Sequence, residues 1–236
     1  MILDIYKDAF EFSGRKIPNL LILGVLSFLY FLIIPGILFY GYEYRVIKQS
    51  TQSMINGKDE PPKFDDFKKM FIDGLKYIAV AIVYLLIPII IFIAASFTQG
   101  AVNVVLIILG IIVGIISNLL LCVAIPHMAN NDDSLSSAFS ISEITKIIAS
   151  IGYGRFLLAF IGIVLISAVV FAVVFVLLMI VLVLLTGVSA SFSIGSVESM
   201  GLVSNIVMNA VLLFIVAPYM ALFQSRCVGL LYNLGS

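Results

Sequence analysis

Two adjacent carboxylates, Asp65 and Asp66, could serve acid–base chemistry, and Asp73 follows in the same segment. An enzyme acting on lipids at the membrane surface could use such carboxylates, but it would normally add a nucleophile, a base or a metal. The sequence contains no GxSxG, no HExxH, no phosphate-binding loop and no readable Cys/His pair. We therefore expect no catalytic residues and no enzymatic activity, with the paired carboxylates facing solvent.

A metal centre is the second chemistry to consider, because the single histidine, His127, is followed closely by Asp132 and Asp133. A metal site needs several converging ligands at suitable spacing, and one histidine with two adjacent aspartates does not provide them. The aspartates are more typical of a cap for the next helix. Cys122 and Cys227 lie in or beside apolar stretches without CxxC spacing, as small buried hydrophobic residues do. The sequence thus predicts no bound metal and no cofactor.

Three asparagines lie within long apolar stretches, at Asn118, Asn205 and Asn209. Asn205 and Asn209 are four residues apart and share a helix face. Two interpretations stay open: these side chains form interhelical hydrogen bonds worth about 0.6 kcal/mol each, or they form a polar lining for a ligand. The interiors of the last four of the five apolar stretches given below contain no Asp, Glu, Lys, Arg or His, which argues against ion-coupled transport.

The composition places the whole chain in a membrane. Of its 236 residues, 62% are hydrophobic and only 11% are charged, with a mean hydropathy of +1.22. A soluble domain would be about 25% charged. The formal net charge is zero and there is no long basic run, so nucleic acid is not expected as a partner. The first residues carry Asp4, Asp8 and Glu11, unlike a cleavable signal peptide.

Five apolar stretches reach the roughly 20 residues that a membrane helix needs, and they cover residues 17–40, 75–97, 101–126, 156–185 and 202–224. We therefore predict an all-α integral membrane helical bundle with about five transmembrane helices, forming a single membrane domain over residues 1–236. One alternative stays open for the first stretch. It spans with an external N-terminus, or it enters the membrane and returns, with Pro35-Gly36 helping it to turn.

Lysine and arginine concentrate in alternate connections between these stretches. The first connection holds six of them between Arg45 and Lys69, whereas the second, "SFTQG", has none. The third holds Lys146 and Arg155, and the fourth again has none. Because basic connections stay on the cytoplasmic side, we predict a multi-pass protein of the cell membrane with its charged connections in the cytoplasm.

The most charged segment, residues 57–76, has the pattern of an amphipathic helix. Phe64, Phe67, Phe71 and Leu75 form an apolar stripe, and the opposite face carries charge. That charged face is a candidate docking surface formed by Asp65, Asp66, Lys68, Lys69 and Asp73. We predict cytoplasmic interfacial helices over residues 3–13, 64–75 and 134–150, each followed by a span, which suggests an internal repeat.

The segment "GYEYRVIKQS" followed by "GKDEPPKFDDFKKMFIDGLK", then a span interrupted at "YLLIP", resembles an uncharacterised family of polytopic membrane proteins common in archaea. The similarity covers most of the chain, including "SLSSAFSISEI". Its most specific part is P-P-x-F-x-D-F-x-x-x-F-x-D-G-L-K, matched at Pro61, Pro62, Phe64, Asp66, Phe67, Phe71, Asp73, Gly74, Leu75 and Lys76. The resemblance implies a membrane location and a multi-span helical fold. It brings no assigned reaction.

We expect a non-enzymatic structural or accessory protein that organises the membrane, as a homo-oligomer or with a membrane-protein partner. The main alternative is a passive transporter or channel for a small or lipid-like molecule, with Asn118, Asn205 and Asn209 along the route. A third hypothesis is the interfacial lipid enzyme that would use Asp65, Asp66 or Asp73. In every case the lipid bilayer is the first partner.

Overall fold

The computed structural model describes residues 1–191 and 197–236, and the side chains of residues 1–185 and 202–236. Within these ranges every regular element is a helix. The helices are α1 (Ile2–Gly14), α2 (Ile17–Phe28), α3 (Ile33–Ser50), α4 (Phe67–Ser96), α5 (Gly100–Asn130), α6 (Leu135–Ala138), α7 (Ile141–Ile151), α8 (Tyr153–Ser191), α9 (Val197–Val211), the π-helical turn η1 (Leu212–Val216) and α10 (Ala217–Tyr232). The all-α fold predicted from the sequence is confirmed.

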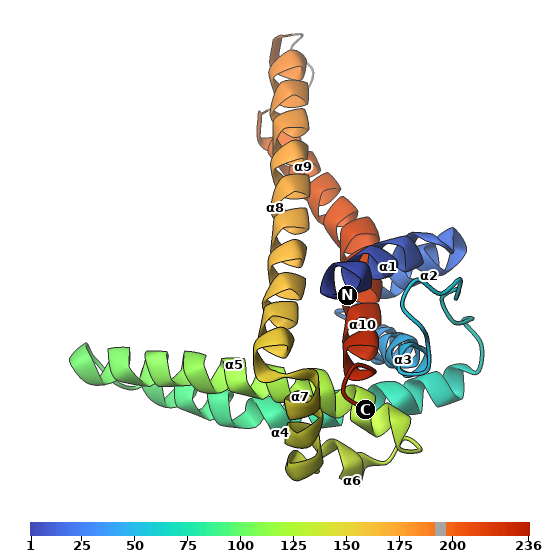
Figure 1. The fold of residues 1–236 in the computed structure, drawn as a ribbon. Helices are drawn as coiled ribbons and strands as arrows, with labels where there is room; N and C mark the ends of the chain where they lie inside the picture. Colours follow the sequence, from blue (N-terminus) through green and yellow to red (C-terminus); the bar gives the residue numbers. More distant parts are fainter. Residues whose placement is uncertain (192–196) are drawn as a thin grey trace.

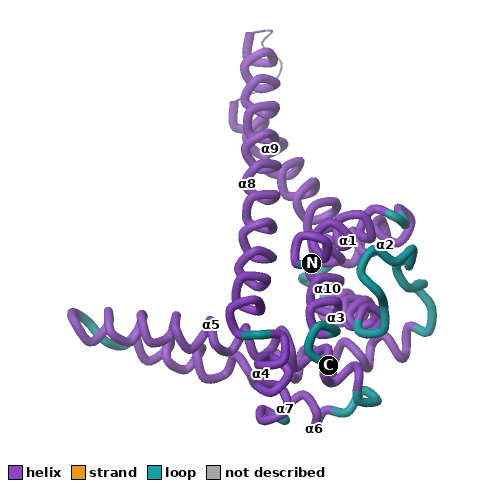
Figure 2. Tube along the Cα trace, in the orientation of Figure 1, coloured by secondary structure: helices purple, strands orange, loops and turns teal. Residues whose placement is uncertain are grey.

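Two pairs of long helices extend from a more compact body. Figure 1 shows α4 packed along α5, and α8 beside α9, projecting in different directions from the region of α1, α2, α3 and α10. The N- and C-termini both lie at this body, and Figure 2 shows that most of the loop structure, including the long connection from α3 to α4, also lies there. The body is therefore where residues distant in sequence meet.

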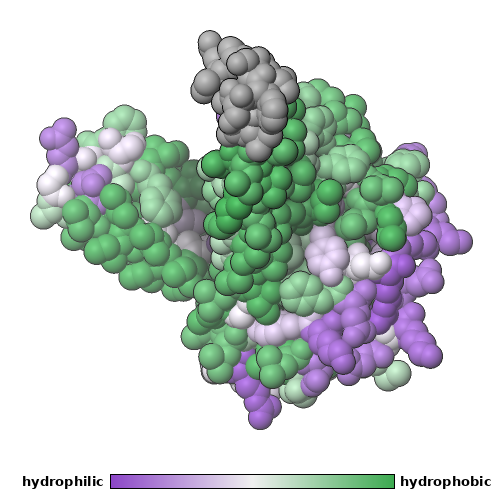
Figure 3. All heavy atoms as spheres, turned by 90° about the horizontal axis from the view of Figure 1, so that it is seen from above, coloured by the Kyte–Doolittle hydropathy of each residue, from purple (hydrophilic) through white to green (hydrophobic). Residues whose placement is uncertain are grey.

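Four described helices are long and apolar enough to cross a membrane: Phe67–Ser96, Gly100–Asn130, Tyr153–Leu185 and Leu202–Tyr232. Their apolar side chains are largely not buried by the chain itself; Val105, for example, is 62% exposed and Leu158 is 66% exposed. Figure 3 shows hydrophobic residues covering the projecting helices, while hydrophilic residues gather along one side of the body. Such surfaces are unfavourable in water and favourable against lipid chains, which confirms a membrane protein.

The first predicted span is wrong as a single helix, because the chain breaks between α2 and α3. The helix α2 ends at Phe28 and α3 begins at Ile33, so the turn precedes Pro35-Gly36. Proline has no N–H to donate and is best tolerated in the first turn of a helix, which is where Pro35 lies in α3. At 12 residues, α2 is about 18 Å long and too short to span. This helical hairpin favours the alternative of a stretch that turns back.

The charged segment over residues 64–75 is not a separate helix, which corrects the predicted elbow. Asp66 caps α4 by accepting a hydrogen bond from the backbone N–H of Lys69 at 3.1 Å, and the helix then runs unbroken from Phe67 to Ser96. Its buried face carries Met70, Asp73 and Gly74. Of the predicted apolar stripe, Phe67 and Leu75 are exposed and are therefore not packed against the rest of the chain.

Two glycines explain which face of α4 turns inward. A Cβ on Gly74 would overlap the carbonyl oxygen of Ile37 in α3, and a Cβ on Gly41 would overlap the carbonyl oxygen of Met70 in α4. Only residues without a side chain permit this contact between two helix backbones. The resulting α3–α4 packing fixes the rotation of both helices.

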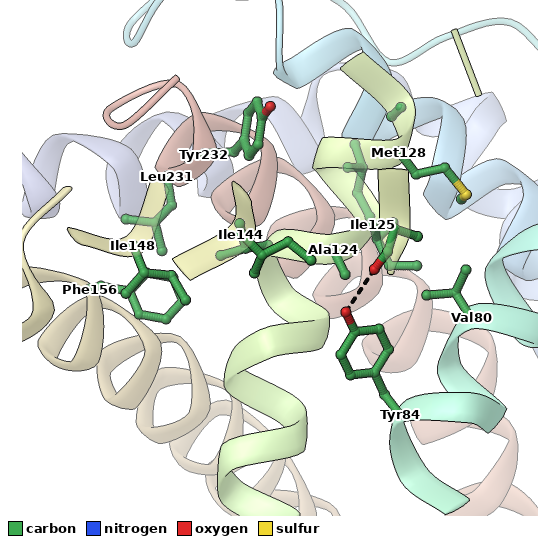
Figure 4. Close-up of a cluster of buried hydrophobic side chains, with 14 of the residues drawn as sticks. Val80, Tyr84, Ala124, Ile125, Met128, Ile144, Ile148, Phe156, Leu231 and Tyr232 are labelled. Atoms are coloured by element: carbon green, nitrogen blue, oxygen red, sulfur yellow. Dashed lines mark hydrogen bonds between the residues drawn. The ribbon is translucent and has the colours of Figure 1, made fainter. Parts of the chain in front are cut away.

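The end of α5 and the region of residues 134–150 contribute to the hydrophobic core. That region forms two helices, α6 and α7, rather than one. Ile144 and Ile148 of α7 pack with Phe156 of α8 and Leu231 of α10 (Figure 4). The hydroxyl of Tyr84 in α4 donates to the carbonyl of Ala138 at 2.7 Å, and this bond ties α6 to the core.

Candidate functional site

A cavity of about 240 Å³ lies where α3, α4, α5, α8 and α10 meet. Most of its wall is apolar, including Tyr77, Leu121, Ile125 and Phe160. Polar groups enter it from three elements, namely Glu43 of α3, Asn118 of α5, and Gln224 and Ser225 of α10. An apolar cavity with a few convergent polar groups is the usual form of a small-molecule site.

Glu43 is the unusual member of this cavity. Its residue is 9% exposed, and the part of the chain that the structure describes offers its carboxylate no hydrogen bond and no ion pair. Burial away from water disfavours the charged form and raises the pKa of Glu43 to about 8. An isolated buried carboxyl is costly and is a strong indicator of a functional site.

The helix geometry of α3 separates Glu43 from the nearest basic side chain. Arg45 lies two residues further, about 200° around the helix, and points into another set of contacts. Its guanidinium donates to the carbonyl oxygens of Asp65 at 2.6 Å and Asp66 at 2.8 Å, and lies 3.2 Å from the Asp65 carboxylate. Arg45 therefore fixes the start of α4 and is unavailable to Glu43.

A second, larger hollow of about 430 Å³ adjoins the cavity. Tyr77 and Leu121 line both spaces, so the two spaces meet at these two side chains. The hydroxyls of Tyr30 and Tyr40 lie 3.0 Å apart, and the Tyr40 ring stacks on Tyr77 with centroids 5.1 Å apart. We call this hollow the tyrosine groove; it is lined by Tyr30, Tyr40, Tyr77, Ile78, Ala81, Ile82, Leu85, Leu86, Ile89 and Leu121.

The predicted docking surface is partly used inside the protein. Asp65 pairs with Arg45, Asp66 caps α4, and Asp73 is buried with its Oδ2 3.9 Å from Nε of Arg45. Lys68 and Lys69 are exposed. The charged segment thus holds α3 against the start of α4, and only part of it faces outward.

Asp133 forms hydrogen bonds with side chains of both α3 and α4 near the start of α4. Tyr44 and Lys48 of α3 both donate to its Oδ1, at 2.7 Å and 2.6 Å, and Lys76 of α4 donates to its backbone carbonyl at 2.8 Å. Burial by itself would raise the pKa of Asp133, but these hydrogen bonds, first that of Lys48, hold the pKa below its usual value. Asp133, which the sequence suggested as a helix cap, therefore joins α3 and α4 to the turn between α5 and α6.

A second buried charge, missed in the sequence, is Arg226. Arg226 follows the predicted span over residues 202–224, but in the structure it lies within α10 and is 0% exposed. It pairs with Asp8 of α1 at 2.8 Å and with Asp59 of the α3–α4 connection at 3.0 Å. Its guanidinium also lies 4.7 Å from the ring centroid of Phe12. Unlike Glu43, this charge is compensated from two sides.

The sequence around Asp8 and around Glu43 indicates that each of these two carboxyl groups is unusual. Asp8 shares the apolar face of α1 with Ile5, Ala9 and Phe12, so an acidic residue interrupts an otherwise apolar stripe. Glu43 has no basic residue three or four positions away in either direction, where a helical ion pair would require one.

The three predicted membrane asparagines are not brought together. Asn118 lines the Glu43 cavity, and its amide donates to the Gly114 carbonyl at 2.8 Å. Asn205 and Asn209 lie on α9, where the Asn209 amide donates to the Asn205 carbonyl at 2.8 Å, and both are exposed. Neither lines the cavity or the tyrosine groove.

His127 is held by protein side chains. Its Nδ1 lies 3.0 Å from the Tyr232 hydroxyl and its Nε2 lies 3.0 Å from the Glu143 carboxylate. In the described part of the chain, no three histidine, cysteine, aspartate or glutamate residues are grouped as metal ligands. His127 thus links α5 to α7 and α10.

The fold and the cavity define a class: a multi-pass helical membrane protein with a buried carboxyl in a cavity between its helices. Residues 28–179 match the family described as Protein of unknown function (DUF4013), and the chain belongs to this family. The match confirms the resemblance to an uncharacterised family. No curated protein and no solved structure matches the chain.

Proposed function

We propose that this protein is a non-enzymatic membrane protein that binds a small lipid-like molecule in the Glu43 cavity. The observation that carries the proposal is the single carboxyl of Glu43, buried without a partner and facing a mostly apolar space. Folding does not gain from such a group, because its desolvation cost is not offset by any described contact. A ligand that satisfies the carboxyl would offset that cost.

The position of the cavity supports a ligand that arrives through lipid. Four of its five bordering helices are α4, α5, α8 and α10, which contain the segments able to span the membrane. The tyrosine groove beside it is lined by aliphatic side chains of α4. The non-enzymatic part of the proposal rests on the sequence, which lacks the nucleophile and metal motifs considered above.

An accessory role that organises the membrane is the second candidate. It is favoured by the exposed apolar surfaces of the projecting helices and by exposed Lys68 and Lys69 at the start of α4. In this proposal the charged connections lie in the cytoplasm of the cell, and the apolar surfaces contact a second copy or another membrane protein.

Native mass spectrometry of the protein, extracted from its own membrane in a mild detergent, tests the first proposal. Val228 lines the cavity, so Val228→Phe should fill it, whereas Val105→Phe adds the same volume on an exposed face. We expect wild type and Val105→Phe to retain a small molecule that Val228→Phe has lost, with equal helical content by circular dichroism.

Equal retention by both variants, or no retained molecule in any of them, would overturn the binding proposal. A stoichiometric protein partner, lost after charge reversal at Lys68 and Lys69, would instead support the accessory role.

A further inference from the structure

The chemistry of the cavity narrows the class of ligand beyond the proposed function, on which this step rests. We infer that the cavity selects a cationic amphiphile, with its positively charged head group beside Glu43 and its alkyl chain in the tyrosine groove. Three features support this assignment: the charge of the lining, the shape of the two spaces, and the aromatic rings between them.

The described lining of the cavity contains one acidic residue and no basic residue. Among the described residues that line the cavity, Glu43 is the one acidic or basic side chain with a formal charge, and the others are apolar, amide, hydroxyl, phenol or thiol groups. The basic residues of α3 are engaged elsewhere, Arg45 with Asp65 and Lys48 with Asp133. An anionic head group would meet an acid with no compensating cation, whereas a cationic one would complete an ion pair in a region of low dielectric.

The two spaces fit an amphiphile better than a compact molecule. The cavity of about 240 Å³ and the tyrosine groove of about 430 Å³ share Tyr77 and Leu121. Together they fall within the roughly 300–1,000 Å³ typical of ligand sites, while the cavity alone is smaller. From Ile78 to Ile89 the groove follows α4 for about 16 Å, which suits an alkyl chain.

Aromatic rings lie where the head group would enter. Tyr40 and Tyr77 stack on each other where the two spaces meet, and Tyr77 lines the cavity that contains Glu43. The face of a tyrosine ring attracts a cation, and more strongly when water is excluded. The rings therefore favour the same sign of charge as the carboxylate.

Binding of such a ligand should be coupled to the release of the proton from the carboxyl group of Glu43. The titratable groups facing Glu43 are Tyr40 of its own helix, Tyr77 of α4 and Cys122 of α5, while α8 and α10 contribute neutral lining. None of them is a cation. Because the pKa of Glu43 is raised to about 8, the carboxyl is mostly protonated below that pH. A cation must then displace the proton, so its affinity should rise with pH and level off above about 8.

Equilibrium dialysis tests this with the full chain in phosphatidylcholine nanodiscs, subtracting the uptake of empty nanodiscs. The probes share one alkyl chain and differ in head group: dodecyltrimethylammonium, dodecanol and dodecanoate. At pH 8.5 we expect wild type to prefer the cation over the alcohol by about tenfold or more. Glu43→Gln should abolish that preference for the cation over the alcohol, and Glu43→Asp should keep it.

The results distinguish a failure of the cationic-ligand assignment from a failure of the proposed binding function. If wild type and Glu43→Gln bind the cation and the alcohol equally, or if dodecanoate binds best, the cationic assignment is overturned. In that case a loss of all probe binding in Val228→Phe would still support the proposed function. If no probe binds above the level of empty nanodiscs, both are overturned.

Discussion

Removing the carboxylate of Asp8 should destabilise this protein more than most single substitutions. Asp8 and Arg226 are each 0% exposed, and they join α1 to α10 across 218 residues of sequence. In Asp8→Leu, the Arg226 Nε would lose its partner while the guanidinium stays buried. Removing one member of a buried ion pair costs about 3–5 kcal/mol. Asp59 still holds one Nη, so we expect about 3 kcal/mol, the lower end of that range.

The assay is a titration with sodium dodecyl sulfate in mixed micelles, following helicity by circular dichroism to obtain the free energy of unfolding. Asp4→Leu is the matched control, because Asp4 lies on the same helix and its side chain is 52% exposed. That change should stay within about 0.5 kcal/mol of wild type. The double variant Asp8→Leu with Arg226→Met removes both charges and should recover most of the loss.

The reasoning would be refuted by either of two results. One is an Asp8→Leu variant as stable as the Asp4→Leu control, which would mean that Arg226 is not buried as described. The other is a double variant whose loss equals the sum of the single losses, which would mean that the two side chains do not interact.

Three further predictions concern packing, pH and the cavity. Gly74→Ala should destabilise the protein by about 1–3 kcal/mol in the same titration because its methyl group meets the α3 backbone, whereas Gly154→Ala, which meets nothing within 4 Å, should not. The pKa of Asp133 is lowered in the fold, so its contribution to stability should be present above its unfolded pKa and be lost as pH falls through its folded pKa; Lys48→Met should flatten this dependence in thermal unfolding between about pH 5 and 2. Glu43→Leu should raise the midpoint of the same titration, because it removes an unpaired buried carboxyl; a lower midpoint would show that Glu43 stabilises the fold.

The long helices could be predicted from the sequence because each one depends on the composition of a single continuous segment. A run of apolar residues long enough to cross the bilayer needs no distant contact to be recognised, and the last four predicted spans all lie within or largely overlap α4, α5, α8 and the α9–α10 region. The break before Pro35 was also readable as an alternative, since proline limits where a helix can continue. Hydropathy by itself does not distinguish one long apolar helix from two short ones.

The site could not be predicted in the same way, because it depends on contacts between distant residues. Whether Glu43 faces solvent or a cavity is decided by the rotation of α3, and that rotation is fixed by Gly41 against Met70 and Gly74 against Ile37. Arg226 likewise joins residues 8 and 59 only after the chain has folded. The predicted spans over residues 17–40 and 202–224 end before both side chains and so leave them outside the membrane, where most charged residues of a membrane protein lie.

The contrast between these two buried charges bears on function. Arg226 is surrounded by Asp8, Asp59 and the ring of Phe12, so its burial is compensated within the chain and needs no ligand. Glu43 is 9% exposed, and Arg45 two residues away is committed to the start of α4. A fold that pairs Asp65, Asp133 and Asp8 with cations has the means to pair one more carboxylate. That it leaves Glu43 unpaired beside an apolar cavity is explained if the missing cation arrives with a ligand.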